Sequence, residues 1–204
     1  MLNKNQTEIL MLYRNNILLS KTIREISIML NKNYPKVFEA MKSLEKHLAM
    51  SIRKAGKSSI CEINPDEKAI QSLSIVESEL LSQRKDIPLR NINKITNKIK
   101  NPFYILIIGG SYAEGKQKPN SDLDIAIIIP DSEDKKQYNI ALKEGGLIIP
   151  EIHGYVFKTN EFYQMLINKE FNYGKELVKK HILYYGAEQY YKILFEAMKN
   201  GFKI

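Results

Sequence analysis

The sequence predicts an α/β (α+β) protein in which a small α+β domain precedes a larger domain built on a sheet with flanking helices. Three observations favour this class. The first third of the chain places helical periodicity before two strand-like arms. The middle holds two apolar runs, FYILIIG and DLDIAIII, with the length of buried strands. The last third returns to helical spacing.

The composition is that of a globular protein in a reducing compartment. The 204 residues suffice for one large domain or two small ones, and 44% of them are hydrophobic. A single cysteine, Cys61, excludes an internal disulfide framework. No apolar stretch reaches the length of about 20 residues that spans a bilayer, and no signal-peptide pattern opens the chain. We therefore expect a cytoplasmic protein without a membrane partner.

Positive charge is concentrated near the amino terminus. Residues 1–66 carry 11 Lys and Arg against 6 Asp and Glu, which is +5 of the total net charge of +8. This imbalance is compatible with a phosphate-bearing partner, although net charge alone is a weak signal.

Three helices are predicted before residue 50. Apolar residues from Ile9 to Tyr13 lie on one side of the first helix, and Thr22 with Glu25 forms a capping-box pattern at the start of the second. Pro35 suits the first turn of the third helix. The residues expected on the inner side of this third helix are Val37, Phe38, Met41 and Leu44.

The segment LAMSIRKAGKSSICEI predicts a hairpin with its turn at Gly56. Helices followed by a basic hairpin resemble the winged helix-turn-helix modules of microbial regulators, over about residues 4–64. The resemblance implies that the helix Tyr34–His47 enters the major groove of duplex DNA and that the hairpin touches the backbone. The residues expected to contact DNA are Lys36, Lys42, Arg53, Lys54 and Lys57. A dimerisation or protein-docking module is the alternative, and it leaves a homodimer open.

These patterns divide the chain into three parts. Residues 1–64 form the first domain, and residues 65–86 form a linker helix, predicted from a cap at Asn64 and helical apolar spacing up to Leu80. Residues 87–204 form the second domain. Two helices broken near Gly186 are predicted at its carboxyl end.

A glycine turn and two carboxylates follow the buried strand predicted at Phe103–Ile108. Gly109 and Gly110 allow a tight turn and a close approach of backbone N–H groups to an anion. Asp122 and Asp124 share one face of the next strand, with Cα atoms about 6.5–7 Å apart. Carboxylates at this spacing suit a hard cation such as Mg²⁺, which would offset their repulsion.

This middle segment resembles the nucleotidyltransferase superfamily that includes DNA polymerase beta-like and minimal nucleotidyltransferases. The matching elements are Gly110-Ser111, the loop Tyr112–Ser121 and the sequence Asp-Leu-Asp-Ile from Asp122. The resemblance implies a mixed sheet and Mg²⁺- or Mn²⁺-dependent transfer of a nucleoside monophosphate from an NTP, with ATP expected, to a hydroxyl. It implies metal binding by Asp122 and Asp124. The residues expected at the nucleotide are Gly109, Gly110, Ser111 and Ser121.

The family usually supplies a third carboxylate from a later strand, predicted here at Leu147–Phe157. Glu151, His153 and Tyr155 alternate onto one face of that strand. Glu151 is our choice as the third catalytic acid and metal ligand, although Asp is usual and Pro150 disturbs the strand. His153 is the alternative candidate for this role. A third possibility is that Glu151 has no function and is an exposed glutamate on a sheet edge.

Two functions follow from these predictions. The first is an enzyme that nucleotidylates a protein, small molecule or RNA end, with an antitoxin-like role toward a protein acceptor as one version. The second is a winged-helix transcriptional regulator whose nucleotidyltransferase-like domain only senses nucleotide.

Overall fold

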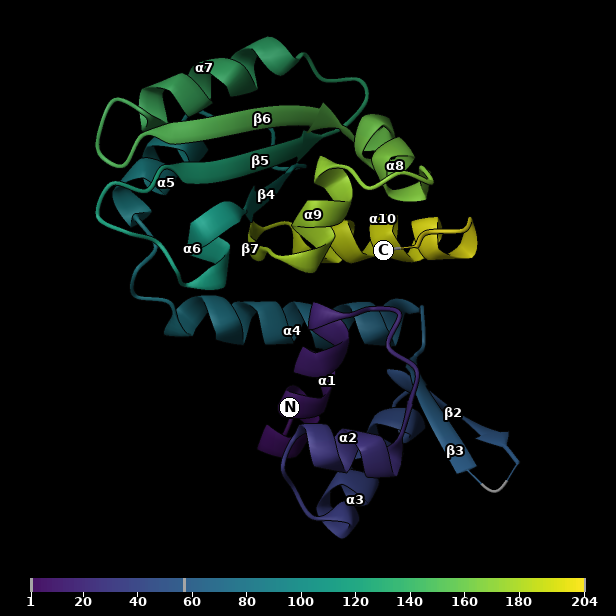
Figure 1. Cartoon of the computed structure of the whole chain (residues 1–204). Helices are drawn as coiled ribbons and strands as arrows, with labels where there is room; N and C mark the ends of the chain where they lie inside the picture. Colours follow the sequence, from purple (N-terminus) through teal and green to yellow (C-terminus); the bar gives the residue numbers. More distant parts are fainter. Residues whose placement is uncertain (1, 57, 204) are drawn as a thin grey trace. The chain divides into compact units, whose positions relative to one another are not determined.

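The computed structural model of the protein describes residues 2–56 and 58–203. Two compact units divide the chain, Met1–Val76 and Glu77–Ile204, and the division falls within helix α4 (Glu67–Gln83). Figure 1 colours the chain from purple in the first unit to yellow at the carboxyl end of the second. Within the described part of the chain, no helix has the length and apolar character needed to cross a membrane.

The first unit contains three helices and a small antiparallel sheet of order β1-β3-β2. Its elements are α1 (Lys4–Asn15), β1 (Lys21–Thr22), α2 (Ile23–Met29), α3 (Tyr34–Lys46), β2 (Met50–Ala55) and β3 (Ser58–Ile63). The predicted hairpin is therefore present.

Local signals in this unit have the expected effect, with one exception. The Glu25 N–H donates to Thr22 Oγ1 at 3.2 Å and the Thr22 N–H donates to the Glu25 carboxylate at 2.8 Å, which confirms the capping box. The Thr22 N–H and the neighbouring Lys21 lower the pKa of Glu25 to about 2. The inward orientation predicted for Phe38 is wrong: its side chain is 38% exposed and stacks on Tyr34. Phe38 is one residue removed from the buried stripe that begins at Val37.

The second unit is built on a four-stranded mixed sheet of order β6-β5-β4-β7. Strands β5 and β6 are parallel, whereas β4 is antiparallel to both β5 and β7. The strands are β4 (Ile105–Ile108), β5 (Leu123–Ile129), β6 (Ile152–Lys158) and β7 (Ile182–Tyr185). This arrangement fits the mixed sheet expected of a nucleotidyltransferase fold.

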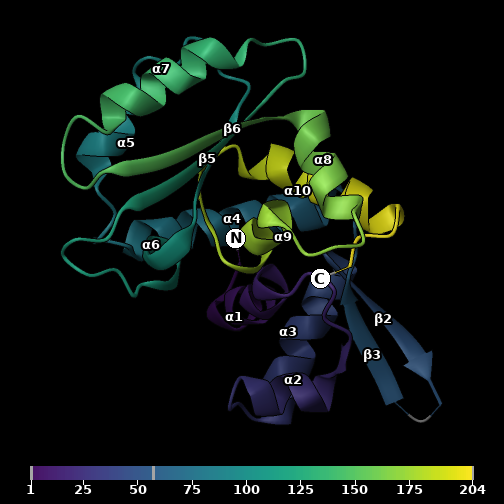
Figure 2. The same ribbon diagram turned by 45° about the horizontal axis from the view of Figure 1, so that its top comes forward.

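Helices cover both faces of this sheet. Figures 1 and 2 show α5 and α7 on one face and α8, α9 and α10 on the other. Their bounds, with those of α6, are α5 (Leu89–Thr96), α6 (Gly110–Glu114), α7 (Lys135–Gly145), α8 (Thr159–Ile167), α9 (Tyr173–Lys179) and α10 (Ala187–Lys199). Alternate residues of β5, from Leu123 to Ile129, are buried in a core with α5 and α7. The intervening residues, which include Asp124, consequently face the side of α8–α10.

Three strand predictions require correction. The first strand begins at Ile105. Phe103 lies before it, is 66% exposed and donates its N–H to the Asn101 side chain at 2.9 Å. The third strand begins at Ile152, since residues 147–151 form a loop. The residues just before Gly186 form strand β7, where a helix was expected. A short apolar run does not distinguish helix from strand, and pairing with β4 decides it here.

A buried asparagine holds the loop before β6. The Asn91 Nδ2 atom lies 3.1, 2.9 and 2.9 Å from the carbonyl oxygens of Gly145, Ile148 and Pro150. Two N–H groups thus serve three carbonyls, and the Asn91 side chain is 1% exposed. The loop uses its carbonyls in these bonds, which explains why the strand starts only after Pro150.

We expect Asn91→Ala to lower the free energy of unfolding by about 2–3 kcal/mol, because it leaves carbonyls without their donor. Urea unfolding followed by circular dichroism measures the change. The control is Asn93→Ala on the exposed side of the same helix, which should change stability by less than about 0.5 kcal/mol. Equal effects of the two substitutions would contradict this account of the loop.

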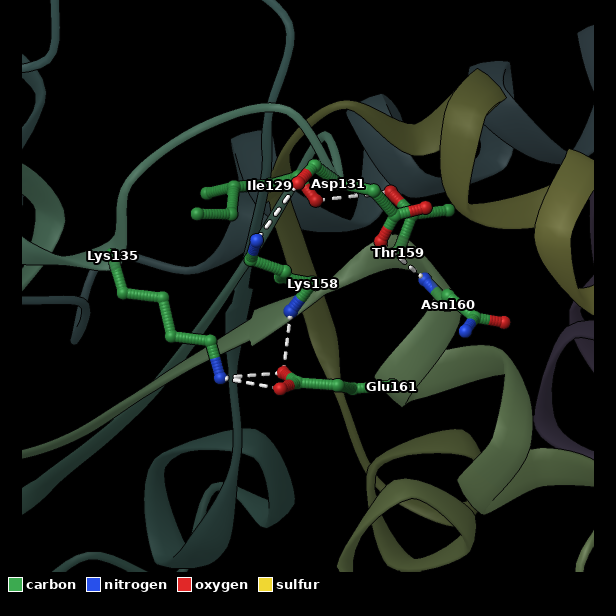
Figure 3. Close-up of polar contacts among 7 residues, drawn as sticks. All are labelled: Ile129, Asp131, Lys135, Lys158, Thr159, Asn160 and Glu161. Carbon is green, nitrogen blue, oxygen red and sulfur yellow. Dashed lines mark hydrogen bonds and ion pairs between the residues drawn. The ribbon is translucent and has the colours of Figure 1, made fainter.

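The carboxyl ends of β5 and β6 are joined by a polar network, drawn in Figure 3. Lys158 Nζ donates to the Asp131 carbonyl at 2.8 Å, and the Asn160 N–H donates to the Asp131 carboxylate at 3.0 Å. Glu161 accepts from the Lys158 N–H and pairs with Lys135 of α7. These contacts fix the start of α8. Asp122 and Asp124, called the acidic pair below, lie at the opposite end of β5.

Candidate nucleotide-binding site

The turn between β4 and α6 brings the backbone against Asp124. The Gly109 N–H donates to the Asp124 carbonyl at 3.0 Å. Gly110 has a φ of +56°, and a Cβ atom at this position would lie 1.9 Å from Asp124 Oδ2. Only glycine satisfies both the left-handed backbone and this close approach. The glycine pair therefore places the first turn of α6 directly beside a carboxylate.

We expect Gly110→Ala to weaken metal-dependent NTP binding by about 10- to 100-fold, because the new methyl group must displace the Asp124 carboxylate. Isothermal titration calorimetry measures the affinity. Gly201→Ala is the matched control, since Gly201 also has a positive φ but has open space around its Cβ position. The control carries the backbone strain alone, so an equal loss of affinity in both variants would contradict a specific role for the Gly110–Asp124 approach.

Asp124 lies in an electrostatically unfavourable position. Partial burial raises the pKa of the Asp124 carboxyl, and the nearby carboxylates of Asp122 and Glu176 raise it further, while His153 lowers it. Burial and like charges both disfavour the ionised form. A cation beside Asp122 and Asp124 would relieve this penalty.

His153 lies beside the acidic pair. It is the register partner of Asp124 on the parallel strand β6, and its Nε2 atom lies 3.6 Å from Asp122 Oδ2. Glu151 accepts the Leu123 N–H through its backbone carbonyl at 2.8 Å, and its side chain is exposed in a pocket shared with Lys143 of α7. The role of Glu151 as the third acid stays a prediction.

No group of three or more His, Cys, Asp and Glu side chains among residues 2–56 and 58–203 is arranged to hold a metal ion. The fit to Mg²⁺ or Mn²⁺ accordingly depends on Asp122 and Asp124. Protein Mg²⁺ sites commonly use one or two carboxylates, with waters and substrate phosphates as the other ligands. Two carboxylates on one face, one of them destabilised in its ionised form, agree with such a site.

The two serines predicted at the nucleotide lie at opposite ends of the intervening segment. Ser111 is half-buried in the first turn of α6. The Ser121 hydroxyl accepts the Lys118 N–H at 2.8 Å and closes the turn that leads into β5. Their contacts with nucleotide remain predictions.

Sequence reasoning missed two residues from α9. The Tyr173 hydroxyl is buried and has no hydrogen-bond partner among the described residues, and burial together with Asp124 raises the pKa of this phenol. Glu176, one turn further on, adds negative charge near Asp124. No pattern in the sequence connects α9 with β5, because tertiary packing alone brings them together.

The residues predicted to contact DNA lie in the first unit. Lys36 and Lys42 are exposed on α3, and Lys42 pairs with Glu45 at 2.8 Å. Arg53 on β2 is exposed and pairs with Glu62 on β3 at 3.2 Å, while Lys54 is exposed beside it. Lys57 lies outside the described residues.

Comparison with known proteins agrees with the fold of the second unit. Residues 89–183 match the family model of the nucleotidyltransferase domain. This match confirms the resemblance over these residues and supports transfer of a nucleoside monophosphate as the general activity of this domain. No curated protein matches the chain.

One solved structure, the crystal structure of the toxin-antitoxin with AMP-PNP, is similar to part of the chain. The two are 16% identical, the alignment covers 55% of this chain and 87% of the other, and the TM-score is 0.39. A TM-score at this level supports no argument about fold or function.

Proposed function

We propose that the protein is a cytoplasmic enzyme that transfers a nucleoside monophosphate from an NTP, with ATP as the expected substrate, to a hydroxyl group. The observation that carries the proposal is the close approach of Gly110 to the Asp124 carboxylate. It supports a site in which a phosphate-binding turn and the acidic pair act on one ligand. The family match over residues 89–183 gives the class of reaction.

Each residue has a defined part in this proposal. The N–H groups of Gly110 and Ser111, with the Ser111 and Ser121 hydroxyls, orient the triphosphate. Asp122 and Asp124 hold Mg²⁺ or Mn²⁺. The bound ion would offset negative charge on the triphosphate and lower the pKa of the acceptor hydroxyl.

The reaction itself depends mainly on positioning. The acceptor oxygen forms a bond to the α-phosphorus, the bond from that phosphorus to the pyrophosphate oxygen breaks, and pyrophosphate leaves. The acceptor's proton passes to Glu151, the proposed third carboxylate, or to water. His153 is the alternative group for this role because of its place beside Asp122.

A protein hydroxyl is the acceptor in the version that we propose to test first, an antitoxin-like modification of a partner protein. The test incubates the purified protein with each NTP, labelled on its α-phosphate, and Mg²⁺, alone and in extract of its own cells. Label on a macromolecule supports the proposal. If the protein binds NTP but nothing becomes labelled, nucleotide sensing is the better function.

We also propose that the first unit is a winged helix-turn-helix module that binds duplex DNA. The order of three helices and a hairpin, with exposed Lys36 and Lys42 on the third helix, supports this function. The exposed apolar pair Tyr34 and Phe38 on the same helix supports the alternative of protein docking or a homodimer.

We expect replacement of Arg53, Lys54 and Lys57 by Ala to weaken DNA binding and to reduce its salt slope by up to about three units, one for each lost phosphate contact. Because Arg53 pairs with Glu62, we expect its replacement to reduce the salt slope by less than one unit. Mobility shifts on genomic fragments at several salt concentrations measure the slope.

A second triple variant controls for net charge. It replaces Lys94, Lys98 and Lys100, which are exposed in the second unit, and should leave the slope unchanged. Absence of any shift with the unmodified protein at low salt would favour docking or dimerisation over DNA binding.

A further inference from the structure

Three aromatic rings gather beside the acidic pair. The Tyr155 and Tyr173 rings have centroids 5.1 Å apart, and those of Phe157 and Tyr173 are 6.0 Å apart. Tyr155 and Phe157 lie almost parallel, with an interplanar angle of 12° and centroids 6.2 Å apart. We call Tyr155, Phe157 and Tyr173 the aromatic cluster. It joins β6 to the first residue of α9.

The register of the sheet fixes the position of this cluster. Asp124 on β5 is the partner of His153 on β6, and Tyr155 follows two residues later on the same face. Across two parallel strands this step corresponds to about 8 Å between the Cα atoms of Asp124 and Tyr155. A ribose spans such a step between the phosphates and the base of a nucleotide.

The opposite face of β6 is closed by α7. A Cβ atom at Gly154 would lie 2.8 Å from the side chain of Leu142, and Val156 is buried. Tyr155, between these two residues, is 51% exposed on the other face. The strand thus buries one face against α7 and presents an aromatic ring on the face that carries Asp124.

Tyr173 connects the cluster with the turn at Gly109 and Gly110. Its hydroxyl lies 3.8 Å from the position that a Cβ atom of Gly109 would take, and it interacts electrostatically with both Asp124 and Tyr155. This hydroxyl is the buried polar atom without a partner noted above.

We propose that the exposed face of Tyr155, supported by Tyr173 and Phe157, stacks on the base of the NTP. The inference rests on the proposed function, because it places the base of the ligand whose phosphates lie at Gly110 and Asp124. Stacking on an aromatic ring accepts any base, since every base has a π face. The structure thereby assigns the nucleoside to the β6 side of the acidic pair.

The test compares two ligands on the full chain with Mg²⁺ by isothermal titration calorimetry. One is ATP with a methylene group between its α- and β-phosphorus atoms, which cannot be turned over, and the other is inorganic triphosphate. We expect Tyr155→Leu to weaken binding of the ATP analogue by about tenfold or more and to leave triphosphate binding within about twofold. Tyr155→Phe keeps the ring and should bind both ligands within about twofold of the unmodified protein.

A similarly exposed tyrosine in the first unit, Tyr34, provides the control variant Tyr34→Ala, which should change neither affinity. Urea unfolding checks that each variant is folded. Retention of full affinity for the ATP analogue by Tyr155→Leu would overturn the inference, as would equal losses for both ligands. The inference is also overturned if the unmodified protein binds neither ligand.

The proposed function fails differently. If Asp122→Asn with Asp124→Asn leaves triphosphate binding unchanged, the metal and phosphate site is wrong, whatever the Tyr155 variants show. If Tyr155→Leu weakens binding of the ATP analogue alone and the protein transfers no nucleotide, the base site is supported. Nucleotide sensing is then the better function.

Discussion

Replacing Asp122 and Asp124 together by asparagine is expected to lower Mg²⁺-dependent NTP affinity by more than about 100-fold while the fold remains intact. The acidic pair is the only carboxylate pair that the proposal gives to the metal, and Asn keeps the shape while removing the charge. Burial and the neighbouring carboxylates raise the pKa of Asp124, so its negative charge does not stabilise the fold.

Titration calorimetry with and without Mg²⁺ measures this loss. The charge-matched control replaces Glu170 and Glu188, two exposed residues of the same unit, by glutamine and should bind NTP as the unmodified protein does. Unchanged affinity in the aspartate double variant would end the metal-site argument.

The second large effect concerns turnover. We expect Glu151→Gln to lower the rate of nucleotidyl transfer by about 10²-fold or more, with NTP affinity within several-fold, because a positioned catalytic group is lost while the substrate contacts remain. Single-turnover rates on the labelled acceptor provide the measurement.

His153→Gln is the companion variant, since the Nε2 atom of His153 lies 3.6 Å from Asp122 Oδ2. A normal rate in Glu151→Gln together with a large loss in His153→Gln would transfer the role to the histidine. Normal rates in both variants would mean that neither residue activates the acceptor hydroxyl, which would contradict the proposal.

Much of the fold could be predicted because its signals are local. The Thr22–Glu25 capping box, the Gly56 turn and the alternation from Leu123 to Ile129 each depend on residues that are close in sequence. The glycine pair at the start of α6 was recognisable for the same reason, and the close approach of Gly110 to Asp124 explains why glycine is required there.

The features that were missed depend on distant contacts. Residues 182–185 form a strand because β4 offers an open edge, and β6 starts late because Asn91 binds the preceding loop. Tyr173 reaches the site through the packing of α9. Phe38 was misplaced because its neighbour Val37 occupies the buried stripe of the same helix.

The acidic site therefore divides into a predictable and an unpredictable part. Asp122, Asp124 and the glycine turn are adjacent through one pair of strands, whose pattern is visible in the sequence. The neighbours that set the charge balance, His153 and Glu176, come from β6 and α9. His153 was predicted from the sequence as the alternative to Glu151, whereas the contribution of Glu176 follows only from the folded arrangement.

The central claim is that the acidic pair supports nucleotidyl transfer, and the most direct measurement uses ATP labelled in two positions. Parallel reactions with Mg²⁺ in cell extract contain ATP labelled on either the α- or the γ-phosphate. We predict that the acceptor gains label only from the α-phosphate, and that Asp122→Asn with Asp124→Asn abolishes this transfer. Label gained from the γ-phosphate, or undiminished α-labelling by the double variant, would contradict the account.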